Sequence, residues 1–110
     1  MPQITVDHSV PLDRRGFALA LHPLVVEAVD TRLDACKTRF REVQEAVVGD
    51  GSADDVIVHV EIALLSGRTD EVKARLSRAV LDLLPRFVEA NEDVRLSVEI
   101  RDLESSYRKR

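Results

Sequence analysis

The chain has 110 residues, of which 45% are hydrophobic and 33% are charged, and this composition excludes a disordered protein. Sixteen basic and twenty acidic residues give a net charge of −4, which argues against a nucleic-acid partner because such domains usually carry a net basic face. No apolar run approaches the ~20 residues that span a bilayer, so we expect no membrane partner. The length suits a single domain over residues 1–110, and the one cysteine, Cys36, favours a cytoplasmic protein.

In the first half of the chain, side-chain alternation predicts a strand over Gln3 to Asp7. Asp13 is suited to cap a helix that extends to about Asp30. Pro23 falls inside the helical pattern, where proline removes a backbone donor, so we expect a kink or a break near His22.

A second strand is predicted over Cys36 to Val48, although a helix also fits Arg41 to Val47. The sequence Gly49-Asp50-Gly51-Ser52 that follows is the strongest turn signal in the chain.

The second half repeats this order. Alternation predicts a strand over Val56 to Leu65, and Thr69 is suited to cap the next helix. Pro85 is expected to kink that helix, and Asn91 suits its C-terminal end. The segment from Val94 to Arg101 alternates again and predicts the last strand.

The predicted order is β-α-β, turn, β-α-β, which indicates an α+β fold with two helices on one face of a four-stranded mixed sheet. The other face would be half apolar and half charged, which favours its burial against copies of the same chain. The polar tail, residues 105–110, is expected to be mobile or to pack on a neighbouring subunit. The residues assigned to the uncovered face are Arg39, Arg41, Ile57, His59, Glu61, Ala63, Leu65, Arg95 and Glu99.

Pro2 is the first candidate for chemistry. Removal of the initiator methionine would leave Pro2 with a free secondary amine, and burial and nearby cations would lower the pKa of that amine toward neutrality. Such an amine is a competent general base at neutral pH. The alternative is that Pro2 is simply a common residue at a processed N-terminus.

Cations form the second group of candidates. Arg68 follows Gly67 at the start of the second helix, where backbone N–H groups and the guanidinium together could bind a carboxylate. Lys37, Arg39 and Arg41 recur at every second position, so they share one strand face and need acids or an anionic ligand to offset their repulsion. The alternatives are a solvated turn arginine at position 68 and structural ion pairs along the strand, with Glu61 and Glu99 as acids.

Five segments resemble the tautomerase superfamily, and in particular its 5-carboxymethyl-2-hydroxymuconate isomerases. They are Met1-Pro2-Gln3-Ile4, Cys36-Lys37-Thr38-Arg39, Gly49-Asp50-Gly51, Val58-His59-Val60-Glu61-Ile62-Ala63-Leu64-Leu65-Ser66-Gly67-Arg68 and Leu96-Ser97-Val98-Glu99-Ile100. The resemblance covers nearly the whole chain, in order and with fitting spacing.

The resemblance implies two β-α-β units in one sheet, a homotrimer, and a small-molecule carboxylate as substrate. It implies that Pro2 is the catalytic base and that Arg68 binds a substrate carboxylate. The family's strand-two arginine aligns with Lys37, with Arg39 two residues later, so either residue is a candidate for the second carboxylate. The implied reaction moves a proton within a 2-hydroxydienoate from aromatic-compound catabolism and requires neither a metal nor an organic cofactor.

Two other functions remain open. One is a tautomerase of the same fold acting on a different keto–enol acid. The other is a non-catalytic, oligomeric ligand-binding module.

Overall fold

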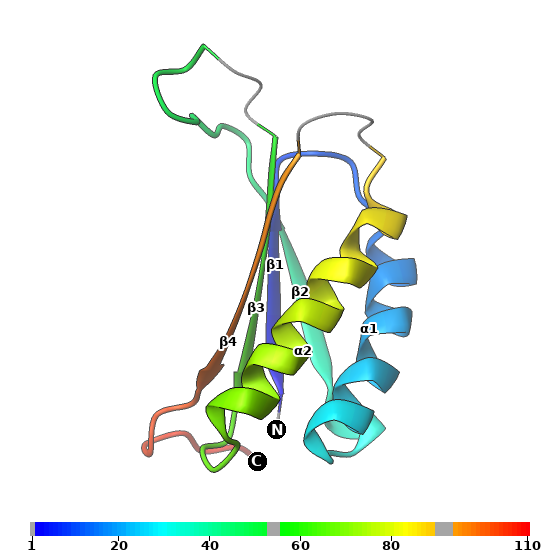
Figure 1. Ribbon diagram of the computed structural model, residues 1–110, viewed down its shortest axis with the longest axis vertical. Coiled ribbons are helices and arrows are strands. Elements are labelled where there is room, and N and C mark those ends of the chain that lie inside the picture. The colour runs from blue at the N-terminus through cyan, green and yellow to red at the C-terminus, as the bar shows by residue number, and fades with distance from the viewer. Residues whose placement is uncertain (1, 53–55, 90–93) are drawn as a thin grey trace.

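A computed structural model describes residues 2–52, 56–89 and 94–110 (Figure 1). The elements in chain order are strand β1 (Gln3–His8), helix α1 (Arg14–Val29), a 3₁₀ turn (Leu33–Ala35), strands β2 (Lys37–Glu42) and β3 (Ile57–Leu64), helix α2 (Asp70–Leu83), a second 3₁₀ turn (Leu84–Phe87) and strand β4 (Arg95–Asp102).

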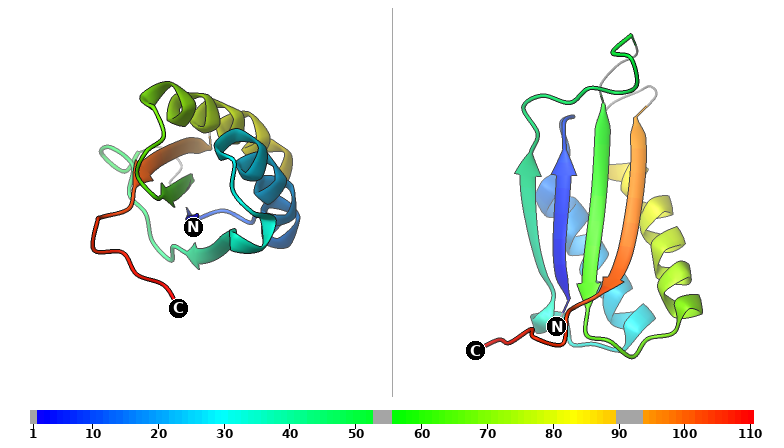
Figure 2. Two further views of the ribbon diagram at one scale, coloured as in Figure 1. Left: turned by 90° about the horizontal axis from the view of Figure 1, so that it is seen from below. Right: turned by 90° about the vertical axis from the view of Figure 1, so that its left-hand side faces the viewer.

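The strands form one four-stranded sheet in the order β2-β1-β3-β4. The pairs β1–β2 and β3–β4 are parallel, and β1 and β3 run antiparallel at the centre. Both helices cover the same face, and the other face is left open (Figure 2). This confirms the predicted α+β arrangement of two β-α-β units in a mixed sheet.

The core lies between the sheet and the helices. Alternate residues of the two central strands point into it and are fully buried, as are single residues spaced along each helix. Phe17 on α1 packs against Phe87, with ring centroids 5.8 Å apart. The fully buried apolar side chains are Ile4, Val6, Phe17, Leu21, Val25, Val58, Val60, Ile62, Leu64, Leu76, Val80 and Leu84.

Helix α1 begins as predicted, because the Asp13 carboxylate accepts a hydrogen bond from the Gly16 N–H. The expected break at Pro23 does not occur, and the helix runs through to Val29. Pro23 is exposed, so the hydrogen bond that it cannot make is lost on the solvent side of the helix, where water can satisfy the carbonyl of Leu19.

Strand β2 is shorter than predicted. It ends at Glu42, because its neighbour β1 ends at His8 and the Val43 N–H makes the last bond, to the His8 carbonyl. Residues 43–52 instead leave the body of the molecule (Figure 1). The predicted glycine turn lies in this segment, with positive φ at Gly49 and Gly51.

Helix α2 begins after Thr69 as predicted, and Pro85 lies in the 3₁₀ turn that follows the helix. The expected kink within the helix is therefore absent: α2 ends at Leu83, and the chain continues as a 3₁₀ turn. The predicted helix end at Asn91 lies outside the described residues. No helix among the described residues is long and apolar enough to cross a membrane.

Candidate functional site

The topology brings three of the four predicted site residues to one end of the sheet. Strands β1 and β2 are parallel and begin at this end, and β3 runs the other way and finishes there, since Gln3 is opposite both Lys37 and Ala63. Pro2 is buried directly before β1, and Arg68 follows the end of β3. The N-terminal strand, the start of β2 and the loop after β3 meet at the lower edge in Figure 1.

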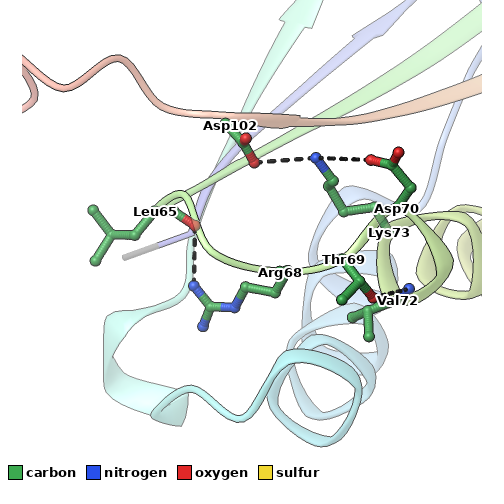
Figure 3. Close-up of polar contacts among 7 residues, drawn as sticks. All are labelled: Leu65, Arg68, Thr69, Asp70, Val72, Lys73 and Asp102. Atoms are coloured by element: carbon green, nitrogen blue, oxygen red, sulfur yellow. Dashed lines mark hydrogen bonds and ion pairs between the residues drawn. The ribbon is translucent and has the colours of Figure 1, made fainter.

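Arg68 is held in place by backbone carbonyls. Its Nη2 donates to the carbonyl of Val29, the last residue of α1, at 2.8 Å. Its Nη1 donates to the carbonyl of Leu65 at 3.2 Å, and Figure 3 shows this second bond. Gly67 turns the chain with φ of 123°, a conformation that other residues rarely adopt. Neither acceptor is charged, so no residue that the structure describes neutralises the guanidinium charge, and three of its five N–H donors make no hydrogen bond within that part of the chain.

The start of α2 does not look like a carboxylate site by itself. The Thr69 hydroxyl accepts a hydrogen bond from the Val72 N–H, so the side-chain cap already uses one of the free donors. Asp70 is in the first turn of α2. Lys73 Nζ forms ion pairs with Asp70 Oδ1, at 3.7 Å, and with Asp102 Oδ1, at 3.2 Å (Figure 3). The acids of this turn would repel an anion, so the helix N–H groups are poorly suited to bind a carboxylate, and Arg68 remains the candidate at this position.

Lys37 and Arg39 lie on the open face of the sheet, as predicted. Lys37 is exposed and its Nζ donates to the Ala35 carbonyl at 3.2 Å. Arg39 reaches across to β1, where Nη2 donates to Gln3 Oε1 at 2.5 Å and Nη1 to Thr5 Oγ1 at 3.4 Å. Neither cation is in an ion pair with the residues that the structure describes, so both charges remain available to an anionic ligand.

Arg41, the third cation of this row, forms its ion pair with an acid that was not among those predicted. Arg41 forms a two-bond ion pair with Asp7 on β1, at 2.7 and 3.2 Å, which raises the pKa of Arg41. Glu61 pairs instead with Arg101 on the other neighbouring strand. Asp7 is the acid that pairs with Arg41, because it is directly opposite Arg41 in the parallel register, and the charge of the expected Glu61 adds a smaller attraction that also raises the pKa of Arg41.

Two residues of this region were not singled out from the sequence. Gln3 Nε2 donates to the Tyr107 hydroxyl at 3.1 Å, while the carbonyl oxygen of the same amide accepts from Arg39. Residues 3 and 107 are 104 positions apart, so no local pattern links them. The available signals were the position of Gln3 next to Pro2 and the fact that Tyr107 is the chain's single tyrosine.

Two further titratable groups lie near these residues. His22 Nε2 is 2.7 Å from the Thr38 hydroxyl, and burial lowers the pKa of His22. Cys36 is buried beside Lys37, and burial raises the pKa of its thiol, which is typical of a packing cysteine. Within the described residues, no group of three or more His, Cys, Asp or Glu side chains could hold a metal ion.

The open sheet face is partly shielded within one chain. Ala63 is only 3% exposed without any neighbouring subunit, whereas Leu65 is 46% exposed. Two grooves of about 310 and 240 Å³ lie between α1 and α2, but no predicted site residue lines either of them. The candidate site is therefore the sheet end with its cations, and not the groove between the helices.

A family model described as 5-carboxymethyl-2-hydroxymuconate isomerase matches residues 11–110. The match includes Lys37, Arg39 and Arg68 and begins after Pro2. A search of curated proteins by sequence found no match.

Solved structures match the fold over most of the chain. A 5-carboxymethyl-2-hydroxymuconate isomerase from Deinococcus radiodurans R1 is similar with a TM-score of 0.81 and 20% identity, covering 98% of this chain and 88% of that one. A 5-carboxymethyl-2-hydroxymuconate delta-isomerase gives a TM-score of 0.73 and 17% identity, with 100% and 87% covered. A fused 4-OT described as a symmetric trimer gives 0.72 and 25% identity, with 92% and 85% covered.

Proposed function

Since the chain belongs to the 5-carboxymethyl-2-hydroxymuconate isomerase family and is an isomerase of the tautomerase fold, we propose that it moves a proton within a 2-hydroxydienoate carboxylate, with Pro2 as the base. The observation that supports this proposal is that buried Pro2, Lys37 and Arg68 all lie at the same end of the sheet. Cations at these positions suit a small acid with at least two carboxylates, of the kind formed in the breakdown of aromatic compounds.

In the proposed reaction the Pro2 nitrogen takes the proton of the substrate's 2-hydroxyl group. The electron pair of the O–H bond forms the 2-oxo group, the double bonds shift along the chain, and a distal carbon takes the proton back from the Pro2 ammonium. One O–H bond breaks and one C–H bond forms, so no electrons are gained or lost. A single base can do both transfers when the substrate is held still.

The cations have separate parts in this proposal. Arg68 binds one substrate carboxylate through the N–H groups that the carbonyls of Val29 and Leu65 leave free. Lys37 and Arg39 lie on the open face and bind the other carboxylate, and their charge stabilises the dienolate oxygen as it forms. No step in this scheme uses a metal or an organic cofactor.

We also propose that the protein is a homotrimer. The support is the open sheet face, which carries the unneutralised Arg39 and the exposed Leu65 at its end, and the trimeric 4-OT relative. Sedimentation equilibrium should give three times the chain mass. A monomer at micromolar concentration would rule this assembly out.

The test of Pro2 uses two variants and a check of intact mass. Pro2→Ala keeps a free amine but loses the ring, so it should retain part of the activity on 2-hydroxydienoates. One extra residue before Pro2 turns its nitrogen into an amide, whose lone pair is delocalised, and should abolish activity while leaving the circular dichroism spectrum unchanged. Activity of the parent should rise with pH through an ionisation below the ordinary α-amine range of about 7.7–8.0. Full activity in a chain shown by mass to retain Met1 would disprove Pro2 as the base.

A further inference from the structure

The C-terminal tail crosses the sheet end where Pro2 lies. After β4, the Leu103 N–H bonds to the Leu64 carbonyl at 2.6 Å, and the tail then runs past the ends of β3 and β1 on the open side of the sheet (Figure 2). A turn closed by the Tyr107 N–H and the Glu104 carbonyl, at 3.0 Å, places Tyr107 against β1. The Tyr107 side chain therefore reaches Gln3, the residue directly after the proposed base.

The direction of each hydrogen bond in this contact is fixed by chemistry. Arginine has only donors, so Gln3 must turn its carbonyl oxygen toward Arg39 and its NH₂ group toward Tyr107. The Tyr107 oxygen must then accept, and its own hydrogen has to point elsewhere. Among the residues that the structure describes, none offers this hydrogen an acceptor.

We propose that the Tyr107 hydroxyl is a substrate-binding donor, which hydrogen-bonds an anionic oxygen of a substrate carboxylate held beside Arg39, and that Gln3 is the positioning residue that orients both donors. This inference rests on the proposed function for the class of ligand. In this assignment the C-terminal tail lines the proposed substrate-binding site.

The two donors are well matched to one carboxylate. They lie at opposite ends of a single amide group, one hydrogen bond from each end, and both are partly exposed on the open side of the sheet. Arg39 contributes a charge that no acid in the described segments neutralises, and Tyr107 contributes a hydroxyl donor. A hydrogen bond to a charged group is stronger than one between neutral groups, so loss of the hydroxyl should be measurable.

Gln3→Glu is the informative partner variant because it keeps the size and shape of the side chain. A carboxylate at position 3 accepts from both neighbours, so it draws the Tyr107 hydrogen inward and neutralises Arg39. The contact between the tail and β1 is retained, while both donors are lost to the ligand. If Tyr107 only anchored the tail, Gln3→Glu would still weaken binding through Arg39, but Tyr107→Phe alone would leave binding unchanged.

The experiment compares the parent, Tyr107→Phe, Gln3→Glu and the double variant, with Lys109→Gln as a control for charge in the tail. Calorimetry measures the Kd of muconate, a dienedioate that lacks the hydroxyl group, and steady-state kinetics measure kcat and KM on 2-hydroxymuconate. Tyr107→Phe should raise Kd and KM about ten- to a hundredfold with kcat changed less than about threefold. Gln3→Glu should raise Kd and KM by a similar factor and should also lower kcat, because it neutralises the Arg39 charge proposed to stabilise the dienolate oxygen, and Lys109→Gln should match the parent. In the Gln3→Glu background, Tyr107→Phe should add less than about twofold.

The remaining possible results either overturn or support the assignment of Tyr107. An unchanged Kd in Tyr107→Phe, a full effect of Tyr107→Phe in the Gln3→Glu background, or no muconate binding by the folded parent would overturn the assignment of Tyr107. Muconate binding that depends on Tyr107 without turnover of any 2-hydroxydienoate would support it and refute the isomerase proposal. Circular dichroism melts confirm that the compared variants are folded.

Discussion

Replacement of Arg68 tests a side chain with two roles, since it joins the end of α1 to the loop after β3 and is proposed to bind substrate. Arg68→Met removes both carbonyl contacts and the charge but keeps most of the apolar stem. Arg68→Lys keeps the charge but replaces the planar fork with a single ammonium group, which cannot span both carbonyls in the same way.

The stability effect follows from these contacts. Hydrogen bonds from a charged donor contribute about 1.5–3 kcal/mol when buried, but the Leu65 contact is exposed and the Val29 contact is only part-buried. We therefore expect Arg68→Met to lower the free energy of unfolding by about 1–2 kcal/mol, which lowers Tm by about 4–9 °C in a chain of this size. Arg68→Lys should lose about half as much.

The activity effect is separate. A carboxylate contact of this kind predicts that Arg68→Met lowers kcat/KM by roughly ten- to a hundredfold, with Arg68→Lys in between. Melting followed by circular dichroism, at one protein concentration, and turnover of 2-hydroxydienoates measure the two effects. Arg15→Met is the matched control, because Arg15 lies at the other end of α1, is exposed, and its side chain has no hydrogen bond or ion pair with a described residue. It should match the parent within about 0.5 kcal/mol and in kcat/KM.

Two outcomes would refute this reasoning. If Arg68→Met melts like the parent, the two carbonyl contacts do not stabilise the fold. If it turns over dicarboxylate substrate like the parent, Arg68 is a structural residue only.

Three further changes have defined outcomes. Gly67→Ala forces alanine to adopt a φ of 123° and should cost about 1–3 kcal/mol in urea unfolding; no loss would mean that the turn relaxes. Phe17→Ala removes a fully buried ring and should cost about 3–5 kcal/mol, whereas Leu19→Ala, at a 60% exposed site, should cost less than about 1 kcal/mol. Because burial lowers the pKa of His22, its contribution to stability is complete above about pH 6.5 and is lost as pH falls through the lowered folded-state pKa. The urea midpoint should therefore drop from pH 7.5 to pH 5, and less so in His22→Gln; an equal drop would assign the effect to other groups.

The sequence by itself determined the elements and their faces. Alternation at Ile4, Val6, Val58 and Val60 indicated which strand faces are buried, and the caps at Asp13 and Thr69 indicated where the helices begin. These features are local, since period-two alternation and a capping oxygen depend on residues a few positions apart. The same local information placed Lys37, Arg39 and Arg41 on one face.

Only the tertiary structure decided how far β2 extends, because the strand ends where its neighbour β1 ends at His8. Pro23 was compatible with the helix because its missing hydrogen bond faces solvent, which the local pattern does not reveal. The sequence pattern also could not predict contacts between distant segments. Asp7 bonds to Arg41 because of the parallel register, and Tyr107 bonds to Gln3 because the tail returns to the first strand. Only the packing of the whole chain brings residues so far apart in sequence within hydrogen-bonding distance.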